Sequence, residues 1–412
     1  MTDCGRLSAI AILVGSFIGL TASQASSQMP QLDEATAERE RKARQVKPHQ
    51  RSTIERALFK LEDDLLLERV LDPPRGIYLR MGSMGQGSGF ALGPAYRYNT
   101  AGFDFKASAA ASTKTYFSGD VSLRFPGTIG QNAYFKAQGP YIELQGRRHV
   151  FPQEDFFGLG PDSLSSNRSD YALRDTLGRV VSGYERGRFH MGVGVGYLDA
   201  SIGSGTDARM PSSTEIFTSD EMPGVNDRGG FLVIEPFVEY ATIDPAIEDH
   251  SGGRYRLSVT QYQDRRHDRY SFRRWDADLR RYLTFVKDTR TIAVRAWAVS
   301  AVAEADNEVP FYLQPTLGGG RTLRGYRTFR FRDTTALLLQ GEYRWRINHF
   351  VQGALFYDTG SVGSDLDDLG DFERSYGIGL RAGGRMGSAF RVEMAFGGHE
   401  GNRLQVSFGD AF

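Results

Sequence analysis

From Arg75 to the end of the chain, short stretches recur in which polar and apolar residues alternate, and this pattern constrains the fold most. Side chains of a β-strand point alternately to opposite faces, so such a stretch forms a strand with one apolar and one polar face. A transmembrane barrel places the apolar face on lipid and the polar face in its lumen, although a soluble β-sandwich also has alternating strands. The clearest example sets Leu337, Leu339, Gly341, Tyr343, Trp345 and Ile347 against Leu338, Gln340, Glu342, Arg344 and Arg346.

The number and spacing of these stretches favour the barrel. About sixteen strands are predicted, an even number as in bacterial barrels. They cover 76–85, 88–98, 102–112, 114–125, 133–149, 171–185, 188–199, 229–242, 251–263, 269–284, 289–303, 335–347, 350–358, 373–383, 389–397 and 403–412. The long connections between them alternate with short ones, so all the long ones would lie on the outer side and the short ones on the periplasmic side. We therefore predict an all-β fold, a transmembrane antiparallel β-barrel over residues 75–412.

Composition excludes several other classes of protein. Lys plus Arg and Asp plus Glu both number 50, so no basic surplus indicates a nucleic-acid partner. The sequence has no G-x-S-x-G elbow, H-E-x-x-H pair or Walker loop, and its seven His show no ligand spacing. Asp276 with Asp278, or the segment 365–368, could bind a divalent cation, but a lumen face and a solvated loop are favoured. We expect no catalytic residue, no cofactor and no metal site.

The N-terminal segment predicts export. Arg6 precedes an apolar run and small residues follow it, which is typical of a signal peptide over residues 1–25; an uncleaved anchor is the alternative. Residues 26–74 are charged and poor in aromatics, which predicts a periplasmic tether. Within it, a capping box at the start of 52–71 and apolar residues at helical spacing predict one short amphipathic helix. That helix could bind a periplasmic partner or enter the barrel mouth, or simply cover the lower rim.

Three motifs then follow in a fixed order. They read Leu-Gly-Gly-Gly-Arg-Thr-Leu-Arg-Gly-Tyr at 317–326, Gly-Ala-Leu-Phe-Tyr-Asp-Thr-Gly at 353–360 and Leu-Gln-Val-Ser-Phe-Gly-Asp-Ala-Phe at 404–412. Together they resemble the BamA/TamA (bacterial surface antigen) family of outer-membrane barrels. Most members also carry polypeptide-transport-associated (POTRA) domains before the barrel, and residues 26–74 are too short and too poor in strand pattern to hold one. The resemblance implies a barrel in the cell outer membrane that inserts or translocates protein, or lipid.

The resemblance also assigns site residues. It implies that the loop carrying Leu323, Arg324, Gly325 and Tyr326 folds back into the lumen. There Arg324 would contact acidic residues on the two following strands, Glu342 and Asp358, and the latter belongs to the strand motif between Phe356 and Gly360. Strand alternation agrees, because it places Glu342 on the polar face and Asp358 on the face of Phe356. The closing strand would carry the terminal signal: Leu404, Val406, Phe408, Gly409 and Phe412.

Function is less constrained than fold. The family's route implies a weak seam between the first and last strands, roughly 76–84 with 404–411, whose edges could pair with an incoming strand. The alternative is a non-enzymatic pore for small solutes, and a surface binding protein using its long loops is a third reading. Expected partners are protein clients, outer-membrane lipids and lipopolysaccharide. The phosphates of lipopolysaccharide would bind a basic run on the outer rim. This run is formed by Arg265, Arg266, Arg269, Arg273 and Arg274, and it is equally plausible that these residues line the lumen.

Overall fold

A computed structural model of the chain describes residues 75–84, 87–126, 138–242, 251–286, 289–348, 350–384, 387–409 and 411–412. All of them belong to one compact unit, Val70–Phe412. The predicted signal peptide, tether and short N-terminal helix lie outside the described residues. No helix in the described part of the chain has the length and apolar character needed to cross a membrane.

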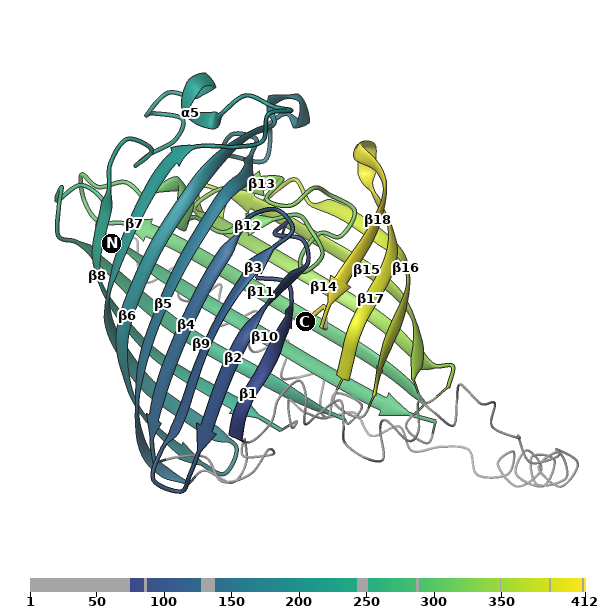
Figure 1. Cartoon of the computed structure of the whole chain (residues 1–412). Helices are drawn as coiled ribbons and strands as arrows, with labels where there is room; N and C mark the ends of the chain where they lie inside the picture. The colour runs from purple at the N-terminus through teal and green to yellow at the C-terminus, as the bar shows by residue number, and fades with distance from the viewer. Residues whose placement is uncertain are drawn as a thin grey trace, which may run out of the picture. The chain divides into compact units, whose positions relative to one another are not determined.

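One antiparallel sheet of sixteen strands curls into a nearly closed barrel, in which the sixteen strands pair in the order of the chain (Figure 1). The sixteen predicted strands are therefore confirmed. They are β1 (Arg75–Gly82), β2 (Ala91–Asn99), β3 (Asp104–Ser112), β4 (Phe117–Phe125), β5 (Gly139–Phe156), β6 (Ser169–Arg186), β7 (Phe189–Ser204), β8 (Gly229–Ala241), β9 (Gly252–Asp264), β10 (Phe272–Phe285), β11 (Arg290–Ala303), β14 (Thr335–Arg346), β15 (Val351–Gly363), β16 (Glu373–Gly384), β17 (Gly387–Gly397) and β18 (Gly401–Phe408).

The connections contain the remaining elements. Two short strands, β12 (Thr316–Leu317) and β13 (Phe331–Arg332), pair with each other inside the connection between β11 and β14. The described helices are single turns: η2 (Ser165–Asn167), α5 (Ser213–Ile216), η3 (Phe311–Leu313) and η4 (Gly398–Glu400). The connections 157–168, 205–228, 304–334 and 364–372 lie at one end of the barrel, here called the loop end. The other end, with connections such as 100–103 and 187–188, is called the turn end.

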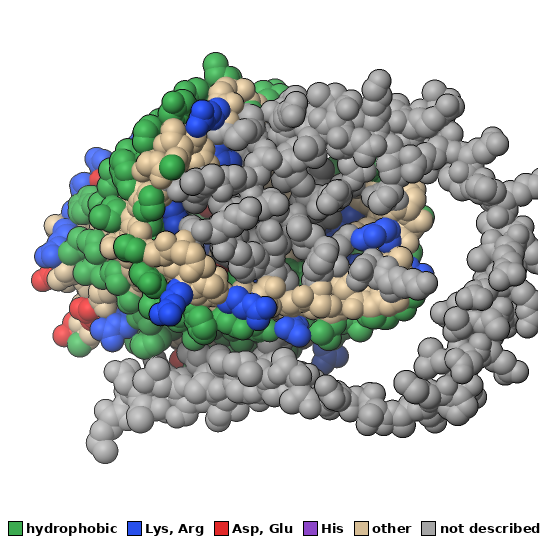
Figure 2. Space-filling model, turned by 90° about the horizontal axis from the view of Figure 1, so that it is seen from below, with side chains coloured by type: hydrophobic (Ala, Val, Ile, Leu, Met, Phe, Trp, Pro, Cys, Tyr) green, Lys and Arg blue, Asp and Glu red, His purple; other side chains and the backbone are tan. Residues whose placement is uncertain are grey.

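The two faces of the sheet differ as the alternation predicts. In β14, Leu339 and Tyr343 are 37% and 38% exposed on the outside, whereas Leu338 and Glu342 are buried on the inside. Figure 2 shows hydrophobic side chains gathered on the outer wall of the barrel. Exposed apolar residues on the neighbouring strands extend this surface: Ile142, Val180, Met191, Val193, Leu257, Ile292, Leu355 and Ile378. An apolar exterior around a polar lumen is the surface that a lipid bilayer requires of a barrel.

The sheet has a seam between its first and last strands. The strand order begins with β1 and ends with β18, and no pairing between these two strands is present among the described residues. Figure 1 shows the gap between β1, in purple, and β18, in yellow. Both strands are only 8 residues long. Two short strand edges therefore face the seam.

Several strand ends differ from the prediction, three of them at places that matter for the loops and the chain end. β5 runs to Phe156 and β7 to Ser204, beyond the predicted ends at 149 and 199. The last strand stops at Phe408, although the sequence predicts it to continue to Phe412. Gly409 has φ +74°, a left-handed conformation that turns the chain out of the strand.

Candidate functional site in the barrel lumen

The connection 304–334, here called the lumen loop, folds back into the barrel. Leu323 and Tyr326 are fully buried, in one apolar cluster with Val299 of β11, Leu338 of β14 and Val362 of β15. The pairing of β12 with β13 draws the two arms of the lumen loop together. The tip of the lumen loop, 318–326, is thereby presented to the inner wall of the barrel.

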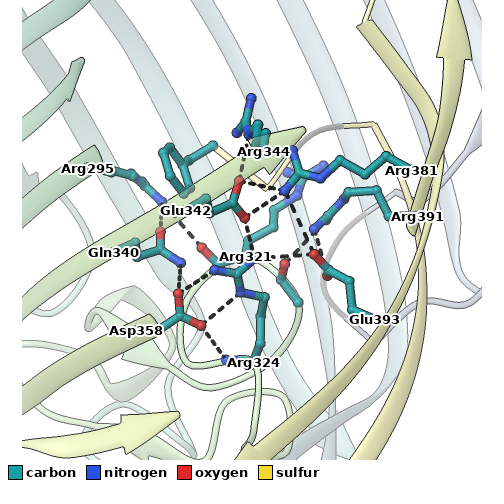
Figure 3. A network of polar contacts seen from close by, with 12 residues as sticks. Arg295, Arg321, Arg324, Gln340, Glu342, Arg344, Asp358, Arg381, Arg391 and Glu393 are labelled. Atoms are coloured by element: carbon teal, nitrogen blue, oxygen red, sulfur yellow. Dashed lines mark hydrogen bonds and ion pairs between the residues drawn. The ribbon is translucent and has the colours of Figure 1, made fainter. Parts of the chain in front are cut away.

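Arg324 is the best-anchored residue of the lumen loop, and its side chain is 0% exposed. Its Nε and Nη2 donate to the two oxygens of Asp358, over 2.8 and 2.5 Å (Figure 3). Its Nη1 donates to Glu342, and a third carboxylate, that of Glu393, lies 3.2 Å from the same nitrogen. A planar guanidinium offers five N–H donors in a fixed fork, so one residue can bind three carboxylates. The structure thus places Arg324 between both acidic residues that the sequence assigned to it.

A wider network surrounds this contact. Arg344 and Arg381 both donate to Glu342, and Arg391 donates to Glu393 over 2.8 Å. Together with Arg324, four guanidinium groups enclose three carboxylates, and all of these side chains are at most 5% exposed. Charges so far from water are tolerated only when they are paired and hydrogen-bonded. The network is therefore a specific arrangement rather than a loose lining of the lumen.

Sequence reasoning missed three of these arginines and Glu393. Arg391 and Glu393 alternate with apolar residues in the strand predicted at 389–397, so their inward direction follows from the sequence. Their contact with Arg324 does not, because it depends on how far the lumen loop reaches across the strands. Phe356 was assigned to the strand motif, and its ring lies 3.6 Å below the Arg324 guanidinium carbon, a cation–π contact.

Two glycines let the lumen loop approach the wall closely. A Cβ on Gly325 would lie 2.4 Å from the Cα of Gly397 on β17, and a Cβ on Gly360 of β15 would lie 2.9 Å from the Cδ1 atom of Leu317 in the lumen loop. Both distances are shorter than any real Cβ contact. Gly325 is thus required by its neighbour's backbone, since nothing larger fits between the lumen loop and β17.

The lumen loop also binds the last strand. The Gln405 side chain donates to the carbonyl oxygen of Arg324, and Arg391 donates to that of Gly320 over 3.3 Å. On the outside of β18, Leu404 and Val406 are 68% and 58% exposed, as their place in an outward stripe requires. The tip of the lumen loop therefore contacts β14 through β18, up to the edge of the seam.

Tyr326 makes the remaining motif contact. Its hydroxyl donates to Glu373 at the start of β16, and its ring packs at 64° on Phe331. Burial, together with the Glu373 carboxylate, raises the pKa of the Tyr326 hydroxyl, which stays protonated and can donate at neutral pH.

We expect Tyr326→Phe to lower the free energy of unfolding by about 1–2 kcal/mol, because one hydrogen bond to a partly buried carboxylate is lost. Glu373→Gln keeps an acceptor at the same place and should cost less. Urea unfolding of the refolded protein in detergent micelles measures both. Equal losses for the two variants would contradict a role for the Tyr326 hydroxyl.

A second anchor holds the other arm of the lumen loop. Arg332 donates to the carbonyl oxygen of Phe311 and to the hydroxyl of Tyr171 on β6, which in turn donates to Glu154 of β5 over 3.0 Å. Arg330 donates to Ser163 and contacts Glu400 beside β18. The lumen loop is therefore held on both sides of the barrel.

The terminal signal residues do not lie together. Phe408 pairs with Phe390 of β17 in the sheet, but Phe412 is 5% exposed inside the lumen, in a cluster with Tyr282 of β10 and Ala293 of β11. The prediction that Phe412 ends the closing strand is wrong. The turn at Gly409 directs the last residues inward, away from β17.

Other candidate groups have partners within the chain. Asp278 binds Arg280 and Arg295, and Asp276 accepts from Arg274 and Trp297. No grouping of three or more His, Cys, Asp or Glu in the described part of the chain is placed to hold a metal ion. Within the basic run proposed to meet lipopolysaccharide, Arg266, Arg269 and Arg274 form ion pairs with Asp199, Glu308 and Asp276.

Comparisons with known proteins agree with this geometry. Residues 233–412 match the Omp85 superfamily domain. The fold is similar to that of BamA from Haemophilus ducreyi lacking POTRA domains 1–3, with a TM-score of 0.56 and 15% identity over 81% of this chain and 69% of that chain. It is also similar to CdiB from Escherichia coli, with a TM-score of 0.52 and 12% identity over 81% of this chain and 61% of that one, less than two thirds of its length. No curated protein matches the chain in sequence. Residues 233–412 thus match the Omp85 superfamily domain, and the fold of the chain is similar to those of BamA and CdiB.

Proposed function

We propose that this chain is an outer-membrane protein that inserts polypeptides into the membrane or translocates them across it. The observation that carries the proposal is the seam: β1 and β18 do not pair in the described structure, while the strands next to β18 are held from inside by Arg324. An apolar outer wall supports a place in a bilayer. Resemblance to the BamA/TamA family supports the outer membrane and polypeptide clients.

The seam offers a physical route for insertion. An edge strand presents N–H and C=O groups that can pair with another chain, and strand addition is a recurring way to bind an extended polypeptide. In lipid an unpaired backbone group costs several kcal/mol, so an incoming strand that pairs with the edge gains strongly. The lumen loop keeps β14 to β18 in place while the seam opens. The rigid wall on one side then gives the client strand a fixed template.

A wide pore for small solutes is less well supported. The lumen loop runs through the interior, with Leu323, Arg324 and Tyr326 fully buried against the inner wall. Arg332 and Arg330 tie its second arm to strands and loops on the opposite side. A lumen crossed by an anchored loop favours low conductance. We also propose that the chain works without catalysis, with lipids as its surroundings and unfolded barrel proteins as its clients.

Reconstitution of the full chain in liposomes of phosphatidylcholine and phosphatidylglycerol tests the proposal. Urea-unfolded outer-membrane barrels are added, and their folding is followed by the shift of the unheated band on a gel. We expect at least about tenfold faster folding than in empty liposomes, the effect of lowering a barrier by about 1.4 kcal/mol. Single-channel recording of the same preparation should show low, flickering conductance. A steady large open state with no effect on client folding would instead establish the pore.

A further inference from the structure

Arg281 of β10 is a charged residue on the apolar outer wall of the barrel. Tyr282, the next residue of the strand, is buried on the lumen side. Because side chains alternate along a strand, Arg281 points outward, on the same face as Leu283, which is 45% exposed. The other charged residues at outward positions of β10 and β11, Arg273 and Arg290, lie within two residues of a strand end. Arg281 alone on these two strands has apolar outward residues on both sides.

No group in the described part of the chain neutralises this cation. The Arg281 guanidinium makes no ion pair there, and its Nε has no hydrogen-bond partner. The residues opposite it in the sheet, Gly253 of β9 and Val294 of β11, have no polar side chain. Arg280, which faces the lumen, instead donates to Asp278 over 2.6 Å. A cation on a lipid-facing wall is costly without a counter-charge, so its partner must come from outside the barrel.

The hydroxyl of Tyr255 is a second donor beside Arg281. Tyr255 lies on the outer face of β9, and a Cβ on Gly253 would lie 2.6 Å from its Cζ. The Tyr255 ring is therefore folded over Gly253, the residue opposite Arg281. Tyr240 of β8 stacks on this ring at 21°, with the ring centres 6.3 Å apart, and holds it in place. A guanidinium next to a phenol hydroxyl suits an anion that has several oxygen acceptors.

This pair of donors lies at the edge of the outer wall nearest the turn end. β9 begins at Gly252 and β8 ends at Ala241, so Gly253 is the second residue of its strand. Figure 2, a view onto the turn end, shows Lys and Arg side chains beside hydrophobic ones along the rim. Tyrosine rings and long basic side chains are typical of the depth at which a membrane protein meets lipid headgroups. The anion within reach is therefore a headgroup phosphate.

We propose that Arg281 and Tyr255 form a binding site for the phosphate of an anionic phospholipid in the leaflet at the turn end. The planar guanidinium donates to two phosphate oxygens, and the Tyr255 hydroxyl donates to a third. The acyl chains lie along apolar outer residues such as Leu257 and Leu339, both 37% exposed. The site favours an anionic over a zwitterionic lipid because no described acidic residue pairs with Arg281. Lipopolysaccharide is not the ligand, because the long connections predicted to lie outside are at the opposite end.

Native mass spectrometry of the full chain, refolded into detergent micelles, tests this site by counting bound lipids. The protein is titrated with phosphatidylglycerol and, in parallel, with phosphatidylcholine. We expect the phosphatidylglycerol Kd to rise at least about tenfold in Arg281→Gln, because a hydrogen-bonded charge pair is lost. Arg281→Lys should recover part of the affinity, since it keeps the charge without the fork. Tyr255→Phe should raise the Kd about fivefold, the effect of one neutral hydrogen bond. Phosphatidylcholine should bind more weakly than phosphatidylglycerol to the parent chain.

Arg273→Gln is the matched control, because it removes one arginine from the same face of the same strand at the loop end. It should leave the Kd for phosphatidylglycerol unchanged. Equal weakening by Arg273→Gln and Arg281→Gln would show general charge attraction and overturn the site, as would equal affinity of the parent chain for the two lipids. The shift of the unheated band on a gel confirms that each variant is folded. No client is present, so lipid binding can fail while the liposome assay of client folding succeeds, and the reverse.

Discussion

Replacing Arg324 by alanine should lower the free energy of unfolding by about 3–5 kcal/mol, the cost of breaking a buried ion pair by removing one partner. Most of this loss of stability should come from the buried carboxylate of Asp358, which is left without a cation. Glu342 keeps Arg344 and Arg381, and Glu393 keeps Arg391, but Arg324 is the one ion-pair partner of Asp358 among the described residues. In Arg324→Ala, Asp358 retains only neutral donors: the side chains of Gln340 and Ser375 and the backbone N–H of residue 324. Urea unfolding in micelles and protease cutting of the lumen loop measure the effect.

A second-site change locates the cost. Arg324→Ala combined with Asp358→Asn removes the uncompensated charge and should recover a large part of the lost stability. Combining Arg324→Ala with Glu342→Gln should recover nothing, because the buried Arg344 and Arg381 then lose the negative charge of the carboxylate to which both donate. Arg327→Ala is the control, because it also removes one arginine from the lumen loop but at a partly exposed position. Equal losses for Arg324→Ala and Arg327→Ala would show that the network does not anchor the lumen loop.

Strand positions were predictable because most wall residues face either the apolar exterior or the polar lumen of the barrel. In β14 this separation holds along most of the strand, and the prediction of 335–347 differs from the observed end by one residue. The prediction fails where strands extend past the apolar part of the outer wall. At the loop end of β5, Phe151, Glu154 and Phe156 are all buried under loops, so the alternation that marks a lipid-facing strand is lost. The extension of β5 to Phe156 was therefore invisible to a pattern based on alternating polarity.

The residues of the candidate site likewise include some that could be predicted from the sequence and some that could not. Arg324, Glu342 and Asp358 could be assigned because a family motif and strand parity coincided on them. Tyr282 carries no such signal, since its partner Phe412 lies 130 residues away and reaches it only through the turn at Gly409. Contacts that depend on where a chain end or loop tip finally lies leave no periodic trace in sequence.

The contact of Gly325 with Gly397 is a further example, and it carries the second large prediction. Gly325→Ala should lower the free energy of unfolding by about 3 kcal/mol, the upper range for forcing extra atoms into a packed site. The added methyl would lie 2.4 Å from the Cα of Gly397 and 2.5 Å from its nitrogen, and backbone atoms cannot rotate away as a side chain could. The lumen loop must then withdraw from β17, which weakens the contact between Arg324 and Glu393.

Gly341→Ala on β14 is the matched control, since a Cβ there meets nothing within 4 Å, and it should be close to neutral. A double-mutant cycle with Arg324→Ala distinguishes a local clash from a loss of loop docking. If both changes act by releasing the lumen loop, the double variant should be little less stable than Arg324→Ala alone, because the methyl no longer meets β17. Fully additive losses would mean that Gly325 and Arg324 stabilise the barrel independently, and the lumen loop would then not act as one docked unit.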